Sequence, residues 1–151
     1  RPILNPELYF ITSGKMNCSI HLRELANHPV IFPEQGSVTR EYIIRQFQKR
    51  NIPLNDYIDC ENPSALKHMV QLGMGGAFLP WYSIESDIKE GKYNYVKVLD
   101  GLSMNIDLVY LQERRKSKSI KTFNTTLNEY RFPKSSADEE TVSPDSENSS
   151  T

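Results

Sequence analysis

The sequence predicts an α/β fold in which a mainly parallel sheet is flanked by helices. Short apolar runs alternate along the chain with segments whose apolar residues recur at spacings of three and four. The connections between these segments are only a few residues long and are rich in glycine, proline and asparagine. This order of strand, helix, strand and helix is typical of βαβ units, whose helices cover both faces of a parallel sheet.

The middle of the chain has the clearest pattern. Apolar residues recur at helical spacing over 66–70, and Gly73 stands where a helix ends in a left-handed residue. Gly75 and Gly76 then permit a close approach of the backbone to its neighbours. A short buried strand is expected over 77–79, closed by a proline.

The other elements follow from the same patterns. Further strands are predicted at 8–11, 30–32, 57–61, 93–99 and 106–111. A short helix capped by Ser19 is predicted to hold Leu22 and Leu25, and another helix is predicted over 83–91. The helix that begins at residue 38 has an apolar face of Val38, Tyr42, Ile43 and Phe47, with Arg40 away from it. A last helix, capped by Ser117 or Ser119, has Ile120, Phe123, Leu127 and Tyr130 on one stripe.

The charge distribution separates the body of the chain from its end. Residues 134–151 contain one Lys and five acids with little apolar content, so we expect a disordered acidic, Ser-rich tail. The remainder holds 17 basic and 14 acidic residues, which is too small an excess for a nucleic-acid-binding surface. The basic run 114–116 is interpreted as a solvated helix entry, with a phosphate contact as the alternative.

No catalytic, metal or cofactor site is predicted. Cys18 and Cys60 form no metal-binding pattern and are interpreted as two free thiols, with a redox-sensing pair as the alternative. The histidines lie on separate elements without a nucleophile or acid at motif spacing. The glycines of 73–76 follow a helix and precede a strand, which is the reverse of a dinucleotide-binding loop. No run of eighteen apolar residues exists, so no membrane span is expected.

Two points on the chain suit a small ligand. Parallel sheets bind ligands beyond the carboxyl ends of their strands, where helices begin. Two loops have this position, and their candidate residues are Gln35, Gly36, Ser37, Val38 and Thr39 in one loop and Asn62 and Pro63 in the other. Free backbone N–H groups and the positive end of a helix dipole favour a carboxylate or another small anion there. The alternative is that Ser37 and Asn62 only cap their helices.

Several stretches resemble a known family. They are Leu25-Ala26-Asn27-His28-Pro29-Val30-Ile31; Gly36-Ser37 with Arg40; Phe47 with Asn51-Ile52-Pro53; Glu61; and Met69-Val70-Gln71-Leu72-Gly73-Met74-Gly75-Gly76-Ala77-Phe78-Leu79-Pro80. The last block is the most specific and is similar to the pattern "lVaaGlGialLP". The chain thus resembles the effector-binding domain of LysR-type transcriptional regulators over about residues 8–131.

The resemblance implies a periplasmic-binding-protein-like fold with an effector in the cleft between two lobes. It implies a crossover strand at 1–11, an effector-binding second lobe at 12–99, a return strand and C-terminal helix at 100–132, and the tail at 133–151. It adds Phe78 to the ligand-binding residues named above. It also implies a cytoplasmic regulator that self-associates as a dimer or tetramer, and that meets DNA only through an N-terminal domain that this sequence lacks.

Two other classes of function stay open from the sequence. A solute-binding protein of a transport system is built on the same fold, and it would carry an export or lipidation segment upstream. An enzyme would need a catalytic constellation, and the sequence offers none.

Overall fold

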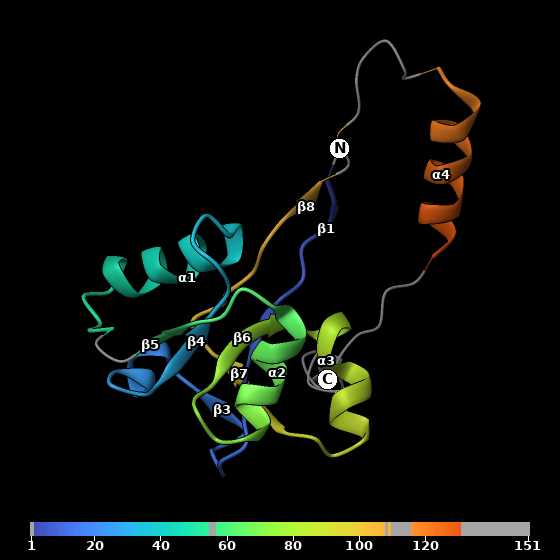
Figure 1. The fold of residues 1–151 in the computed structure, drawn as a ribbon. Coiled ribbons are helices and arrows are strands. Elements are labelled where there is room, and N and C mark those ends of the chain that lie inside the picture. The colour runs from blue at the N-terminus through green and yellow to red at the C-terminus, as the bar shows by residue number, and fades with distance from the viewer. Residues whose placement is uncertain (1, 55–56, 108, 110–115, 131–151) are drawn as a thin grey trace, which may run out of the picture.

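The computed structural model describes residues 2–54, 57–107, 109 and 116–130 (Figure 1). Its strands are β1 (Pro2–Leu4), β2 (Leu8–Thr12), β3 (Ser19–Ile20), β4 (Val30–Phe32), β5 (Tyr57–Asp59), β6 (Ala77–Pro80), β7 (Asn94–Val98) and β8 (Ile106–Asp107). Its helices are the 3-10 helix η1 (Leu22–Leu25) and the α-helices α1 (Val38–Lys49), α2 (Pro63–Gln71), α3 (Trp81–Lys89) and α4 (Lys118–Glu129). The predicted α/β class is confirmed.

The main sheet has the order β3-β7-β2-β6, and β4 and β5 form a separate two-stranded sheet. The two sheets are joined at one parallel bridge, where Ile31 N donates to Gly76 O at 2.7 Å and Gly76 N donates to Pro29 O at 2.9 Å. β2 runs antiparallel to both of its neighbours, β6 and β7. The main sheet is therefore mixed, although β3, β7, β6, β4 and β5 share one direction, as a mainly parallel arrangement predicts.

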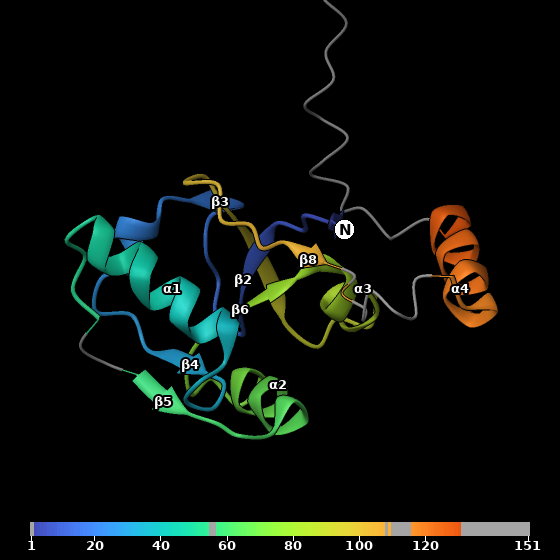
Figure 2. The ribbon, with the colours of Figure 1, turned by 90° about the horizontal axis from the view of Figure 1, so that it is seen from above.

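The central strand β2 supplies both faces of the sheet. Leu8 and Phe10 belong to one hydrophobic cluster, and Tyr9 and Ile11 belong to the other. This follows from the period of two along a strand. The first cluster is closed by η1 and α1 and the second by α2 and α3, so β6 lies between α1 and the other two helices (Figure 2).

Gly76 marks the tightest passage in the core. A Cβ atom at this position would overlap the ring of Phe10, which is fully buried. At Gly75 the nearest atom to such a Cβ is Pro29 O, at 2.9 Å. The predicted close approach is therefore present, and it lets β4 and β6 meet over an aromatic ring. Gly73, with φ +76°, has the expected left-handed conformation.

Two side chains of α1 differ from the prediction. Val38, predicted on the apolar face, is 72% exposed at the first position of the helix. Arg40 was placed away from that face but is buried. It stands three and seven residues before Ile43 and Phe47, so helical spacing puts all three on one face.

Other differences lie at the ends of elements. Ser19 pairs in β3 instead of capping a helix, and η1 has His21 at its N-cap. α3 begins at Trp81, two residues before the predicted start. Short strands such as β1 and β3 carry too few residues for a periodic signal.

The two ends of the chain lie apart from the main sheet. β1 pairs antiparallel with β8, and α4 stands away from the other helices in both ribbon views (Figures 1 and 2). Ser117 Oγ caps α4 by accepting from Ile120 N at 3.3 Å. No side chain of α4 is buried. The predicted acidic tail, 133–151, and residues 108, 110 and 111 of the predicted strand 106–111 lie outside the described residues.

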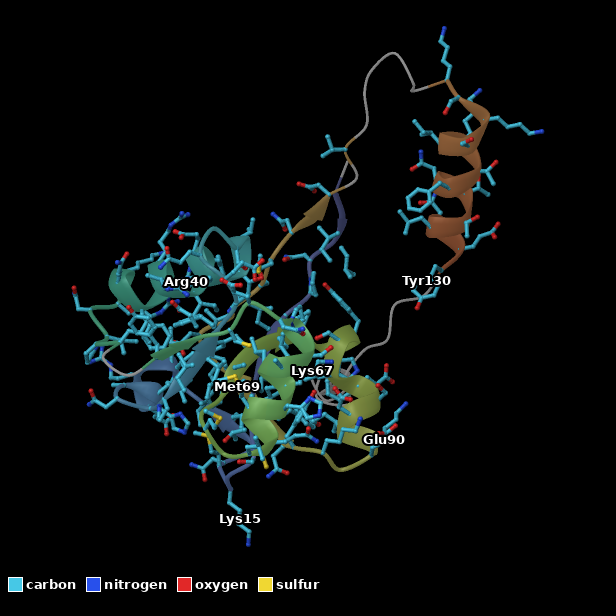
Figure 3. All side chains as sticks on the ribbon, viewed as in Figure 1. Lys15, Arg40, Lys67, Met69, Glu90 and Tyr130 are labelled. Atoms are coloured by element: carbon cyan, nitrogen blue, oxygen red, sulfur yellow. The ribbon has the colours of Figure 1, made fainter. Side chains whose placement is uncertain are left out.

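A polar cluster around Asp87 joins α2 and α3 to the connection that precedes β7. Its carboxylate accepts from Tyr93 Oη at 2.5 Å, Lys67 Nζ at 3.0 Å and Lys92 Nζ at 3.4 Å. Figure 3 shows Lys67 on the side of α2 that faces α3. The hydrogen bond from Tyr93 lowers the pKa of Asp87 most, and the two lysines add to it against the opposing effect of burial. Burial and the Asp87 carboxylate raise the pKa of Tyr93, which keeps that hydroxyl a donor.

Gly76→Ala should destabilise the fold by about 2 kcal/mol or more, because the added methyl group overlaps the ring of Phe10. The measurement is the free energy of unfolding in urea. Gly14→Ala is the control, because its Cβ would meet only Thr12 Oγ1, at 3.7 Å, and should change stability by less than about 0.5 kcal/mol. Equal effects of the two substitutions would contradict the assigned close approach.

Asp87→Asn should lower the free energy of unfolding at pH 7 by about 1–3 kcal/mol, because charge-assisted hydrogen bonds are lost. The folded-state pKa of Asp87 lies below its ordinary value of 3.8, so its contribution is complete above that pH. Unfolding curves at several pH values should show the two proteins converging as the pH falls through the folded-state pKa. Glu85→Gln is the control, since Glu85 pairs with exposed Lys89 and should change stability by less than about 0.5 kcal/mol. A difference between wild type and Asp87→Asn that grows below pH 4 would contradict this.

Candidate functional site

The two predicted ligand loops leave the sheet side by side. β4 and β5 are parallel neighbours in which Ile31 lies opposite Ile58 and Phe32 lies opposite Asp59. Beyond this pair, Cys60 N donates to Phe32 O at 2.8 Å. The carboxyl ends of both strands therefore meet at one edge of the sheet, and α1 and α2 both begin there.

The loop that enters α1 is a tight turn. Ser37 N donates to Glu34 O at 3.2 Å, and Gly36 between them has φ +87°, a conformation that favours glycine. Ser37 occupies the N-cap position, yet its side chain makes no capping hydrogen bond. Ser37, which is half-buried, therefore leaves the first N–H groups of α1 without a cap from its side chain.

The loop that enters α2 is organised by a cap. Asn62 Oδ1 accepts from Ser64 N at 2.9 Å and from Ala65 N at 3.3 Å, and Pro63 occupies the first helical turn. Cys60 Sγ donates to Asn62 O at 3.3 Å, which fixes the preceding chain. The capping interpretation thus holds for Asn62 and does not hold for Ser37.

Phe78 is placed differently from the other candidate residues. It is buried in the first hydrophobic cluster, where its ring centroid lies 5.1 Å from that of Phe10 and 6.3 Å from that of Phe47. The pairing of β4 with β5 starts the chains toward residues 35–39 and toward Asn62 and Pro63 at one edge of the sheet, whereas Phe78 lies in the core.

Arg40 was not among the predicted site residues, although it lies between the two loops. Its guanidinium donates to Pro33 O at 3.2 Å and to the carboxylate of Asp59. Its Cζ atom lies 5.5 Å from the ring centroid of Phe32 and 5.8 Å from that of Tyr57. The signal that could have found it is its spacing from the buried residues of α1, because a charged residue on an apolar face needs a partner.

The charges around the loops set what they can bind. Glu34 and Glu61 are exposed, and Asp59 is paired with Arg40. Recognition of an anion would therefore rest on backbone N–H groups and the helix dipoles. Among the described residues, no group of three or more His, Cys, Asp and Glu side chains could hold a metal ion.

Two further predictions concern the cysteines and a membrane span. Cys18 is exposed, Cys60 is buried, and both are free thiols. Within the described ranges, no helix has the length and apolar character needed to cross a membrane.

Comparison with known proteins identifies the family. The family model of the LysR substrate binding domain matches residues 2–131. The chain belongs to this family. The resemblance noted in the sequence is thereby confirmed, and the match covers every described strand and helix of this LysR substrate-binding domain.

A curated relative and several solved structures are similar to this LysR domain. The HTH-type transcriptional activator CmpR of Synechocystis sp. is 29% identical over 113 residues, which are 75% of this chain and 36% of that protein. The chain thus spans about a third of the length of this relative.

The solved structures share the fold. The effector-binding domain of QuiR in complex with shikimate has a TM-score of 0.69 at 21% identity, over 85% of this chain and 63% of that one. The regulatory domain of Synechocystis CcmR in complex with 2-PG has a TM-score of 0.70 at 19% identity, over 84% of this chain and 64% of that one. The regulatory domain of MetR from N. meningitidis has a TM-score of 0.69 at 15% identity, over 85% of this chain and 64% of that one.

Asn62→Ala should cost about 1 kcal/mol of stability because it removes the cap of α2. Ser37→Ala should change stability by less than about 0.5 kcal/mol, because Ser37 makes no capping bond. Chemical denaturation of both variants checks the pair. A larger loss for Ser37→Ala would show that Ser37 has a structural role and would weaken its assignment to a ligand surface.

Proposed function

We propose that this chain is the effector-sensing part of a LysR-type transcriptional regulator. Its effector is a small molecule with a carboxylate or another anionic group. The contacts would come from residues 35–39 on one loop and from Asn62 and Pro63 on the other. The observation that supports the proposal is the parallel pairing of β4 and β5, after which α1 and α2 begin at the same edge of the sheet.

Two properties of the loops support an anion as the ligand. α1 and α2 direct the positive ends of their dipoles toward the same edge. Since Ser37 does not cap α1, the first N–H groups of that helix are offered to a ligand, together with the Ser37 hydroxyl. At α2, the amide of Asn62 lies at the helix entrance with its oxygen held in place.

The family supports regulation over transport or catalysis. CmpR, to which the chain is similar, is named as a transcriptional activator, and the QuiR and CcmR structures are named as complexes with shikimate and 2-PG. We infer a non-enzymatic regulator in the cytoplasm that self-associates as a dimer or tetramer and meets DNA through another domain. An effector would act by binding one arrangement of the lobes more tightly than the other.

We also propose how this lobe joins a longer protein. Residues 12–99 would form the effector-binding lobe, and residues 1–11 and 100–132 would connect it to a first lobe. The antiparallel pair of β1 and β8 supports two chain crossings at one place. β2 lies in the middle of the sheet and directly follows β1. The chain from the first lobe would therefore enter this lobe at the N-terminal end of β2.

Binding of an acid at the two loops is tested by thermal unfolding with shikimate, 2-PG and a panel of small carboxylates. A ligand at 100 times its Kd should stabilise the chain by about 2.7 kcal/mol, which raises the midpoint temperature by several degrees. Asn62→Asp keeps the capping oxygen but adds a negative charge, so it should weaken the binding of an anion by about tenfold or more.

The control for this experiment is Ser86→Ala, an exposed position on α3 outside both loops. It should leave the gain in midpoint temperature unchanged. The site assignment fails if a stabilising acid binds Asn62→Asp as tightly as it binds the wild type. The proposal of an anionic effector is wrong if no member of the panel stabilises the wild type.

A further inference from the structure

Arg40 is a buried cation at the junction of the two loops, and the proposed function does not use it. It is the third residue of α1, and its side chain is only 7% exposed. Figure 3 shows it on the helix that follows the first loop. A buried guanidinium costs free energy unless its charge and N–H groups are satisfied, so its partners must be built in.

The partners of Arg40 come from both loops. Pro33 O belongs to the chain leaving β4, and the Asp59 carboxylate stands at the last residue of β5. The guanidinium also lies within 6 Å of two ring centroids, those of Phe32 and Tyr57, which come from the same two strands. One side chain therefore ties α1, the exit of β4 and the exit of β5 together.

These contacts show that Arg40 is not an anion receptor itself. It donates to Pro33 O and to the Asp59 carboxylate, and its side chain is buried. Asp59, by contrast, is 43% exposed. Its carboxylate precedes Asn62 by three residues, so an uncompensated charge there would oppose an anion at the loops.

We propose that Arg40 is a positioning residue of the effector site. It holds the turn between Pro33 and Ser37 against the end of β5, and it neutralises Asp59. This inference rests on the proposed function and deepens it, because it names the group that sets the distance between the two helix N-termini. Glu34 and Glu61 are exposed, so solvent and salt screen their charges.

The test uses four variants of the chain. Arg40→Gln removes the cation, Asp59→Asn removes the anion, and the double variant removes both charges. Arg45→Gln is the matched control, since Arg45 lies exposed on the same helix. Two measurements are made where all proteins are folded: amide hydrogen exchange of the ligand-free chain, and titration with 2-PG and inorganic phosphate followed by the amide resonances of residues 36–38.

The exchange measurement reports on the turn without any ligand. Arg40→Gln should speed exchange of the Ser37 amide, which is bonded to Glu34 O, by about tenfold or more relative to the amides of α2. Arg45→Gln should leave it unchanged. Uniform acceleration across the chain, or none, would overturn the positioning role.

The titration distinguishes the effect of the Asp59 charge on binding from the effect of the shape of the turn. Arg40→Gln should weaken binding by about tenfold or more, because it loosens the turn and exposes the charge of Asp59. The double variant should regain part of that loss, which a purely structural role for Arg40 would not produce. Unchanged affinity in Arg40→Gln, or no recovery in the double variant, overturns the inference. Wild-type protein that binds neither probe, and that no member of the acid panel stabilises, overturns the anionic effector of the proposed function instead.

Discussion

The architecture depends on β2 being buried on both faces. Its side chains divide alternately between the two hydrophobic clusters, with Phe10 in one and Tyr9 in the other, and each is almost fully covered. Such a strand can only lie in the middle of a sheet that has helices on both sides. Burial of these two rings alone contributes several kcal/mol, so the position of β2 determines where β6 and β7 must pair.

From that position the site follows by geometry. β6 lies next to β2, and Gly76 at its start lets β4 bond to the chain across the ring of Phe10. β5 then adds to β4 in the same direction. The two strands that end at the loops are thus the two farthest from the central strand on that side. They are held by few backbone bonds to the rest of the sheet, and side chains such as Arg40 have to complete the connection.

The helices and strands were predicted well because their sequence signals depend on a few adjacent residues. The Asn62-Pro63 cap, the left-handed Gly73 and the alternation around β2 each depend on the chain within a few positions. What the sequence did not reveal depends on distant partners. The burial of Arg40 requires Asp59, nineteen residues away. The exposure of Val38 depends on how the first turn of α1 lies against the rest of the fold, which the spacing of apolar residues does not encode.

The contrast between Asn62 and Ser37 shows how such a site can vary its ligand without changing its fold. Asn62 has a structural task at α2, so its replacement carries a cost in stability. Ser37, Val38 and Thr39 have no comparable bond to protect, since the turn is held by Gly36 and by Arg40 from beneath. When such contacts fix the shape of the loop, the side chains of residues 37–39 can be substituted without changing the fold. Specificity for an effector is therefore expected to lie in residues 37–39, and the frame that presents them is expected to depend on the ion pair of buried Arg40 with Asp59.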